Sequence, residues 1–280
     1  MHLKDPEKSD YFDLGDAYMP KRVLAHEISD NIYETEMLFI ATLAMDFPSG
    51  TTMKYRKELE TKWMKILPGL DKVKVLWVRH LADDSFLEAV CQMKNLEWLR
   101  FETSRIESLA AIAKLQGLKK LELRSSKLVD ISPVLSLKNL EALGIEASFR
   151  IENYETLGQM KQLKALRFAG DAFAPKNLKL DSLLPYTGLS QLEHLELSAV
   201  SVKDKSYEAV LQLEKLVRLD IGSGISSAVA QKIRASHKTL KTGTIFERNY
   251  DGKDFIITKV GVNEFGEAWH ITPKSTPKNQ

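Results

Sequence analysis

The chain has 280 residues, of which 44% are hydrophobic and 28% charged, and 40 Lys and Arg against 38 Asp and Glu leave a formal net charge of +2. This composition allows a substantial buried core, and the balanced charge argues against nucleic acid, whose binding requires a concentrated basic face. The single cysteine, Cys91, excludes an intrachain disulfide. The polar, acidic start of the chain lacks the pattern of a signal peptide, and the longest apolar run, residues 37–45, is shorter than the about 20 residues of a membrane span. We therefore expect a cytoplasmic protein without a membrane partner.

The first 72 residues are predicted to form an N-terminal cap. The stretches KRVLAHEI (residues 21–28) and EMLFIATLAMDF (residues 36–47) favour strands. A helix is predicted over residues 53–67, because Leu59, Trp63 and Ile66 fall on one helical face and Pro68-Gly69 follows as a stop signal.

Residues 73–242 contain an internal repeat. The pattern Leu-x-x-Leu-x-Leu, with Val, Ile or Phe as substitutes, starts at residues 73, 96, 118, 140, 163, 192 and 216, and a degraded copy starts at residue 240. The steps are 23, 22, 22, 23, 29, 24 and 24 residues. Each motif predicts a short strand with two apolar side chains on one face. Between motifs, apolar residues recur every third position, as in Leu128, Ile131 and Val134, which favours 3₁₀ turns.

The remaining residues are predicted to cap the other end. Residues 243–272 favour a β-meander with turns at Asp251-Gly252 and Phe265-Gly266, and residues 273–280 are expected to be disordered. A stack of repeats exposes core at both ends, so a cap is needed at each.

The repeats resemble the leucine-rich repeat family from residue 73 to about residue 245. The 22-residue copies are similar to its short class, which includes phosphatase regulators and bacterial internalin-type surface proteins. The resemblance implies an α/β right-handed solenoid with a curved parallel sheet on the concave face and 3₁₀ or short helical turns on the convex face. The usual asparagine after the strand is replaced by Ser104, Ser126, Ser148 and Asp171.

Side chains between the inward leucines are expected on the concave face, because neighbouring residues of a strand point to opposite sides. They form three rows across the repeats. The first row is Val75, Trp98, Lys120, Ala142, Ala165, His194 and Arg218; the second is Trp77, Arg100, Glu122, Gly144, Arg167, Glu196 and Asp220; the third is Arg79, Glu102, Arg124, Glu146, Ala169, Ser198 and Gly222.

Two features of these rows suggest a binding surface. The third row alternates in charge, which indicates either a solvated ladder of ion pairs or a polar recognition strip. From the fourth repeat onward the residues become small, next to the extra segment of the 29-residue repeat, which is either a recognition loop or an insertion that packs on its own rim. Tryptophans 77 and 98 are binding anchors unless the N-terminal cap covers them. The candidate partner-binding residues are Trp77, Trp98, Arg100, Glu122, Arg124, Glu146, Arg167, Phe173, His194, Glu196 and Asp220.

No reaction or metal motif is recognised, so no catalytic residue, metal or cofactor is predicted. Cys91 lies on a return segment, where a half-buried structural thiol is expected. The leading interpretation is a monomeric, non-enzymatic protein-binding module that acts as an inhibitor, an adaptor or a bacterial immunity protein neutralising a toxin. Two alternatives stay open: an enzyme with its site in a terminal cap, and a surface or adhesion protein of the internalin type.

Overall fold

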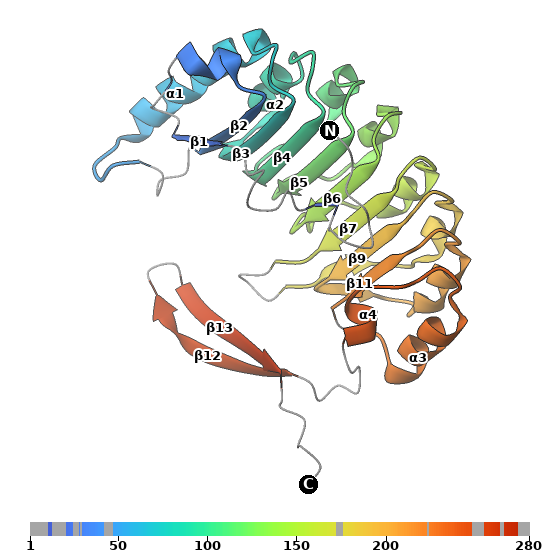
Figure 1. Cartoon of the computed structure of the whole chain (residues 1–280). Coiled ribbons are helices and arrows are strands. Elements are labelled where there is room, and N and C mark those ends of the chain that lie inside the picture. Colours follow the sequence, from blue (N-terminus) through green and yellow to red (C-terminus); the bar gives the residue numbers. More distant parts are fainter. Residues whose placement is uncertain are drawn as a thin grey trace.

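The chain folds as a curved stack of repeats with strands on the inner side and helical turns on the outer side (Figure 1). The computed structural model describes residues 11–12, 21–24, 28, 30–41, 47–171, 176–222, 224–247, 255–263 and 266–273. Nine parallel strands form one sheet in chain order. They are β1 (Lys21–Leu24), β2 (Met37–Ala41), β3 (Val75–Ala82), β4 (Trp98–Ser104), β5 (Lys120–Ser125), β6 (Ala142–Glu146), β7 (Ala165–Ala169), β9 (His194–Ser198) and β11 (Arg218–Ile221). This arrangement confirms the predicted leucine-rich-repeat solenoid.

The convex side is built from short 3₁₀ helices and a few α-helices. The apolar residues at every third position before the third, fourth and fifth repeat strands are all buried, which confirms the period-three prediction. The 3₁₀ helices are η2 (Asp30–Glu34), η4 (Leu67–Gly69), η5 (Ala110–Lys114), η6 (Ser132–Ser136), η7 (Tyr154–Gln159), η8 (Leu184–Gly188) and η9 (Tyr207–Gln212). The α-helices are α1 (Met53–Ile66), α2 (Asp84–Val90), α3 (Ser227–Ser236) and α4 (Thr244–Glu247).

The N-terminal strands extend the repeat sheet. Strand β2 pairs with β3 from Met37↔Val75 to Ala41↔Arg79, so β1 and β2 continue the concave face. Helix α1 confirms the predicted helix: the Thr52 hydroxyl caps it by accepting from the Tyr55 N–H, and Trp63 is fully buried. Burying a side chain of this size stabilises the fold by about 2–3 kcal/mol.

Strand β4 contains one more residue than β5 between their paired positions. Phe101 pairs with Leu123, and the next pair is Ser104 with Ser125. The prediction that Ser126 takes the place of the asparagine that usually follows the strand is therefore wrong. Ser125 is the buried residue, and its hydroxyl donates to the Ile106 carbonyl at 2.7 Å and accepts from the Leu128 N–H, whereas Ser126 is exposed.

The extra segment of the 29-residue repeat forms a second small sheet. Its strand β8 (Leu178–Leu180) pairs in parallel with β10 (Val200–Val202) of the next repeat. Leu178 and Leu180 are buried in the main core, so this part of the segment packs on its own repeat. Residues 172–175 lie outside the described part of the chain.

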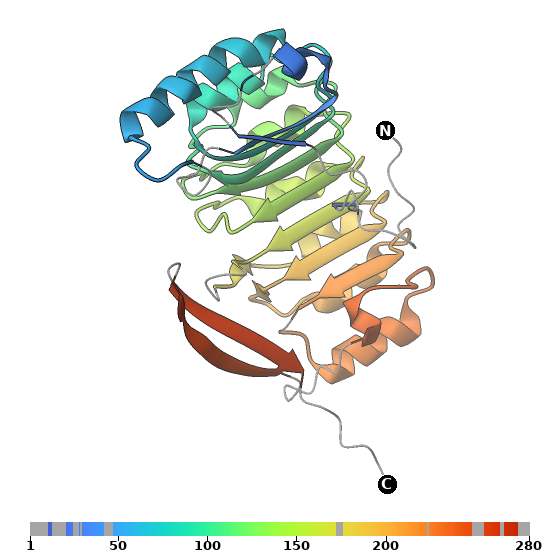
Figure 2. The same ribbon diagram turned by 60° about the vertical axis from the view of Figure 1, so that its left-hand side comes forward.

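The last copy of the repeat, at residue 240, forms only a bridge between Thr242 and Arg218. Of the predicted meander, the structure describes helix α4 at its start and one antiparallel hairpin, β12 (Phe255–Asn263) and β13 (Gly266–Pro273) (Figure 2). The expected turn at Asp251-Gly252 and the tail after Pro273 lie outside the described residues, as does Phe265.

Candidate functional site

The first two predicted rows of the concave face are correct residue by residue. Trp98, Lys120, Ala142, Ala165 and His194 are successive partners across β4 to β9. Glu122, Gly144, Arg167, Glu196 and Asp220 align in the same way. The third row is offset, because Arg79 pairs with Thr103 along the backbone instead of Glu102.

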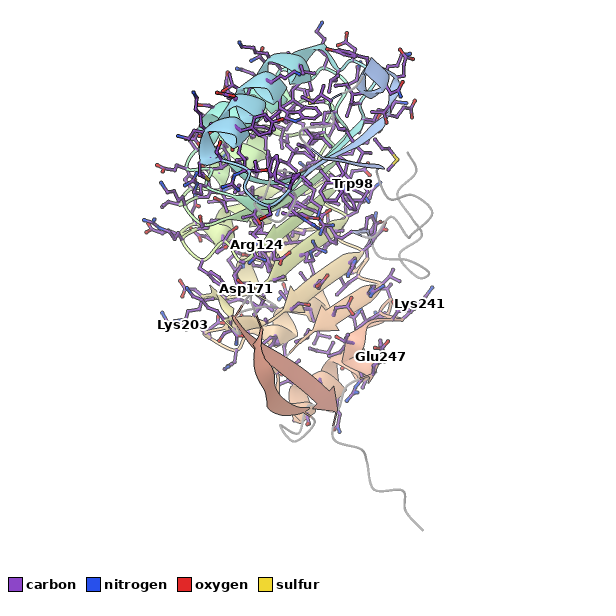
Figure 3. The ribbon with its side chains drawn as sticks, turned by 90° about the vertical axis from the view of Figure 1, so that its left-hand side faces the viewer. Trp98, Arg124, Asp171, Lys203, Lys241 and Glu247 are labelled. Carbon is purple, nitrogen blue, oxygen red and sulfur yellow. The ribbon has the colours of Figure 1, made fainter. Side chains whose placement is uncertain are left out.

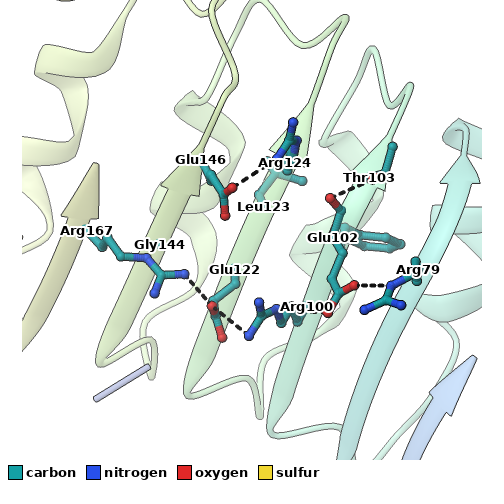
Figure 4. A pocket seen from close by; sticks show the side chains of 11 residues that line it. Arg79, Arg100, Glu102, Thr103, Glu122, Leu123, Arg124, Gly144, Glu146 and Arg167 are labelled. Carbon is teal, nitrogen blue, oxygen red and sulfur yellow. Dashed lines mark hydrogen bonds and ion pairs between the residues drawn. The ribbon is translucent and has the colours of Figure 1, made fainter. Parts of the chain in front are cut away.

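The middle of the concave face carries a network of half-buried ion pairs (Figure 4). Arg79 Nε lies 2.6 Å from a Glu102 carboxylate oxygen, despite the register offset. The guanidinium of Arg100 lies 3.8 Å from Glu102 and 3.7 Å from Glu122. Arg124 contacts Glu146 at 3.0 Å. The predicted alternation of charge is therefore realised as ion pairs between side chains of neighbouring strands.

One ion pair of this network spans an intervening strand. Arg167 on β7 donates to Glu122 on β5 at 2.6 Å, across Gly144 on β6. Adjacent strands are about 4.8 Å apart, so a side chain at position 144 would stand between the two partners. Glu122 is 3% exposed and also accepts from the Trp98 indole N–H at 3.0 Å. This carboxylate on β5 therefore anchors side chains from two other strands, β4 and β7.

The network surrounds an open groove, which we call the charged groove. Its cavity of about 500 Å³ is lined by four arginines, three glutamates and a few smaller residues: Arg79, Arg100, Phe101, Glu102, Thr103, Glu122, Leu123, Arg124, Gly144, Glu146 and Arg167. A second hollow of about 270 Å³ shares Arg100, Glu146 and Arg167 and reaches Glu196 and Ser198. Together the two hollows run over β3 to β9.

The inserted segment contacts the charged groove through an ion pair. Arg124 donates to Asp171 at 2.8 Å, at the start of that segment. Figure 3 looks onto the concave side, where Trp98, Arg124 and Asp171 follow one another along the stack. The segment is therefore tied to the groove as well as packed into the core.

Aromatic rings line the N-terminal end of the concave face. Phe39, Trp77 and Trp98 contact in sequence, with ring centroids 6.0 and 5.7 Å apart in edge-to-face geometry. A cation covers each ring: Arg79 at 5.2 Å, Arg100 at 4.7 Å and Lys120 at 4.1 Å, respectively. Trp77 and Trp98 are 3% and 1% exposed. The tryptophans are therefore buried and are not free anchors. Arg100 and Lys120 of the repeats lie over their rings, and of the predicted cap region Phe39 contacts Trp77.

The surface of small residues predicted from the fourth repeat onward is covered only in part. Ala169, Gly170, Ser198 and Ala199 line the second hollow, whereas the first-row residues Ala142 and Ala165 are covered. Ala142 and Ala165 are fully buried, and with Tyr11 and Phe12 they form an apolar cluster separate from the main core. Phe12 also lies against Gly144, where an added Cβ would come within 3.3 Å of the Phe12 ring. Tyr11 and Phe12 therefore occupy the surface at residues 142, 144 and 165, which was predicted to be open to a partner.

His194 and Asp220 form a closed cluster at the C-terminal end. His194 Nε2 lies 3.0 Å from the Asp220 carboxylate, which also accepts from Arg218 at 2.6 Å and from the Thr244 backbone N–H at 2.9 Å. Burial raises the pKa of Asp220, but the hydrogen bonds from His194, Arg218 and Thr244 outweigh it and hold this pKa at about 2. His194 is fully buried and Asp220 nearly so. These two predicted binding residues therefore hold the last repeat together.

The predicted candidates divide into three groups. Arg100, Glu122, Arg124, Glu146 and Arg167 line the charged groove, and Glu196 lies beside it, accepting from Ser198 at 2.7 Å. Trp77, Trp98, His194 and Asp220 are buried. Phe173 lies outside the described residues.

The dipeptide Tyr11-Phe12 on the concave face and its contacts were not predicted from the sequence. Tyr11, Phe12 and Glu193 were not among the candidates, although two adjacent aromatics in an otherwise polar, acidic stretch are a usable signal. Arg79 and Glu102 were assigned to the alternating row but were not named as binding residues.

The described side chains show neither a metal-binding cluster nor an ionised thiol. Within that part of the chain no group of three or more His, Cys, Asp or Glu residues is placed to hold a metal ion. Burial raises the pKa of the Cys91 thiol to about 12, so it is a neutral thiol at pH 7. No helix in the same residues is long and apolar enough to cross a membrane. What the concave face offers is a preorganised array of charges.

Comparison with known proteins gives distant structural likenesses. No protein-family model matches the chain, and no curated protein is significantly similar to it. Among solved structures, an internalin C2 of Listeria monocytogenes is 20% identical, over 64% of this chain and 73% of that one, with a TM-score of 0.44. A second internalin of that species is 16% identical over 63% and 70%, with a TM-score of 0.34. A leucine-rich-repeat protein of Leptospira interrogans is 15% identical over 80% and 61%, with a TM-score of 0.38. Because these likenesses are weak, the evidence for the architecture is the repeat pattern and the parallel sheet of this chain.

Proposed function

We propose that this leucine-rich-repeat solenoid is a non-enzymatic module that binds a protein partner through the charged groove. The observation that carries the proposal is the groove itself: arginines and glutamates from five strands, β3 to β7, held in place by cross-strand pairs and by the aromatic rings below them. A rigid, preorganised surface loses little conformational entropy on binding.

The mixture of charges favours a protein partner over nucleic acid. Arginines and glutamates alternate along the groove, so no continuous basic face is available for a phosphate backbone. The fixed fork of an arginine matches a carboxylate of a protein partner but also matches phosphate, so the alternating glutamates are what favours a protein. A partner surface with interspersed acidic and basic residues complements this pattern and exchanges the internal pairs for intermolecular ones.

Within this proposal, the protein acts by binding to its partner and covering part of the partner's surface. Inhibitor, adaptor and toxin-neutralising immunity protein are roles that such a module can fill, and each requires binding to a protein partner.

Identification of the partner is the first test. The intact protein is used to capture ligands from its native cell, and captured proteins are identified by mass spectrometry and then titrated in purified form. If no captured protein binds when purified, the proposed function is wrong.

A charge swap then tests the placement. The double substitution Arg79→Glu with Glu102→Arg keeps an ion pair in the groove but inverts its polarity. We expect it to weaken partner binding about tenfold, or about 1.4 kcal/mol. Because Glu102 also lies 3.8 Å from Arg100, circular dichroism is used to check that the swapped protein is folded before binding is measured. The matched control swaps the exposed pair Lys127 and Glu107, which lies outside the groove lining. Equal affinity of both swapped proteins for the partner would exclude the charged groove as the binding site.

A further inference from the structure

The dipeptide Tyr11-Phe12 is seated on the concave face as a bound peptide would be. Its side chains are 2% and 4% exposed, and its contacts come from strands β5 to β9, which are distant in sequence. In Figure 2 it is the short blue segment beside the sheet, apart from the blue strands β1 and β2. We call the surface that it covers the aromatic seat: Lys120, Ala142, Gly144, Ala165, Arg167, Glu193 and His194.

Three chemical groups of the dipeptide have a matching group in the seat. The Tyr11 hydroxyl donates to a Glu193 carboxylate oxygen at 2.6 Å. The ammonium group of Lys120 donates to the Tyr11 carbonyl. The guanidinium of Arg167 lies 4.4 Å from the Phe12 ring centroid, a cation–π contact.

The shape of the seat also fits two rings. The His194 ring lies 6.3 Å from Tyr11 and 6.1 Å from Phe12. Alanines at 142 and 165 and the absence of a side chain at 144 leave room above the sheet. Larger residues at these three positions would fill the space that the rings occupy.

The cluster is separate from the core of the solenoid. Tyr11 and Phe12 share their apolar cluster with Ala142 and Ala165, while the leucine columns form a separate, continuous core below the sheet. Departure of the dipeptide would therefore uncover a formed site without opening that core. Arg167 belongs to both surfaces, since it contacts Phe12 and pairs with Glu122 in the charged groove.

We propose that the aromatic seat receives an exposed tyrosine–phenylalanine pair of the protein partner, and that Tyr11-Phe12 is a resident competitor which the partner displaces. This inference rests on the proposed function and specifies its ligand. The contacts use a hydroxyl, a backbone carbonyl and two rings, all of which a segment of another protein can supply. Since the resident pair is tethered, it competes at an effective concentration on the order of millimolar. A partner must therefore bind the charged groove as well, and Arg167 couples the two events.

A peptide titration on the full-length protein tests this proposal. The probe is a fluorescently labelled peptide with the sequence of residues 7–16, EKSDYFDLGD, and the control peptide has alanine at both aromatic positions. The receptor is the full chain with Tyr11→Ala and Phe12→Ala. We expect fluorescence anisotropy to show saturable binding of the probe to this variant, at least tenfold tighter than to the wild type and absent for the control peptide.

Two further variants make the result specific. Adding Gly144→Val to the double variant fills the seat and is expected to abolish probe binding. The single variant Phe12→Leu keeps an apolar side chain but loses the cation–π contact, so its affinity for the probe is expected to fall between those of the wild type and the double variant. It also provides the test if the double variant does not fold.

The outcomes separate this inference from the proposed function. A folded double variant that does not bind the probe, or a Phe12→Leu variant that binds it no better than the wild type, overturns the aromatic seat even when a partner binds the charged groove. Saturable probe binding supports the seat, and it does so even if no partner is captured, in which case only the proposed function fails.

Discussion

The Arg167 guanidinium lies over the Phe12 ring, 4.4 Å from its centroid, while the same side chain donates to Glu122 at 2.6 Å. One residue of β7 therefore joins the dipeptide near the start of the chain to the ion-pair network of the concave face. A substitution in the dipeptide is therefore expected to alter the ion-pair network, and a substitution in the network is expected to alter the seating of the dipeptide.

Filling the space at Gly144 should expel the dipeptide. An added Cβ comes within 3.3 Å of the Phe12 ring and of the Glu122 Cγ, and valine adds two more carbons there. We expect Gly144→Val to make the bond after Phe12 accessible, which chymotrypsin digestion followed by mass spectrometry measures. Gly69→Ala is the control, because a Cβ there meets nothing within 4 Å. Equal cleavage after Phe12 in both variants would contradict the contact between position 144 and the Phe12 ring.

Removing the Glu122 carboxylate should destabilise the fold. Glu122→Ala leaves the Trp98 indole N–H without its acceptor and deprives Arg167 of its ion-pair partner. We expect a loss of about 3 kcal/mol in the free energy of unfolding by urea, and a smaller loss for Glu122→Gln, which keeps an acceptor for Trp98. Asp181→Ala, in an ion pair whose side chains are 80% and 91% exposed, should leave stability unchanged. A loss for Asp181→Ala equal to that for Glu122→Ala would argue against a special role of the buried carboxylate.

The stability of the C-terminal end should depend on pH through Asp220. Its pKa is lowered from 3.8 to about 2, so the charged carboxylate stabilises the fold above pH 4 and this contribution is lost as the pH falls from about 4 to about 2. A shift of this size corresponds to on the order of 2 kcal/mol at pH 6 and roughly half of that at pH 3. Urea unfolding of the wild type and of Asp220→Asn at both pH values measures the effect. A difference between the two proteins that is the same at pH 3 and pH 6 would show that the charge does not matter.

Two glycines with positive φ should respond differently to alanine. At Gly243 (φ +110°) an added Cβ would lie 2.2 Å from the Leu219 carbonyl oxygen, whereas at Gly50 (φ +86°) it meets nothing within 4 Å. Gly50→Ala is expected to cost about 1–2 kcal/mol from backbone conformation alone. Gly243→Ala adds a backbone clash that must push the last half repeat away from β11, so its thermal unfolding midpoint should fall further. Equal midpoints would mean that Gly243 does not set this close approach.

The repeat made most of the architecture predictable, because burial of Leu121, Leu143 and Leu166 recurs at near-constant steps. The same regularity aligned the first two concave rows. The cap residues Asp83 and Ser226, which accept from Phe86 and Val229, also mark the starts of α2 and α3, but the period-three pattern hid these helices. The extra residue in β4 could not be predicted from the sequence, because neighbouring repeats keep the same 22-residue length.

The occupants of the concave face were harder to predict. Tyr11 and Phe12 reach His194 and Arg167 through contacts between distant parts of the chain, which leave no periodic trace. The rows indicated which side chains leave the sheet on the concave side, but not what covers them. Small residues at 142, 144 and 165 therefore suggested empty space, where the structure places aromatic rings.

The pair between Arg167 and Glu122, which passes across Gly144, also bears on how the stack unfolds. In a simple solenoid each repeat interacts only with its two neighbours, so unfolding can advance one repeat at a time. Here β5 and β7 are coupled directly over β6. Unfolding that starts at either end should therefore pause at this block, whose three repeats must melt together.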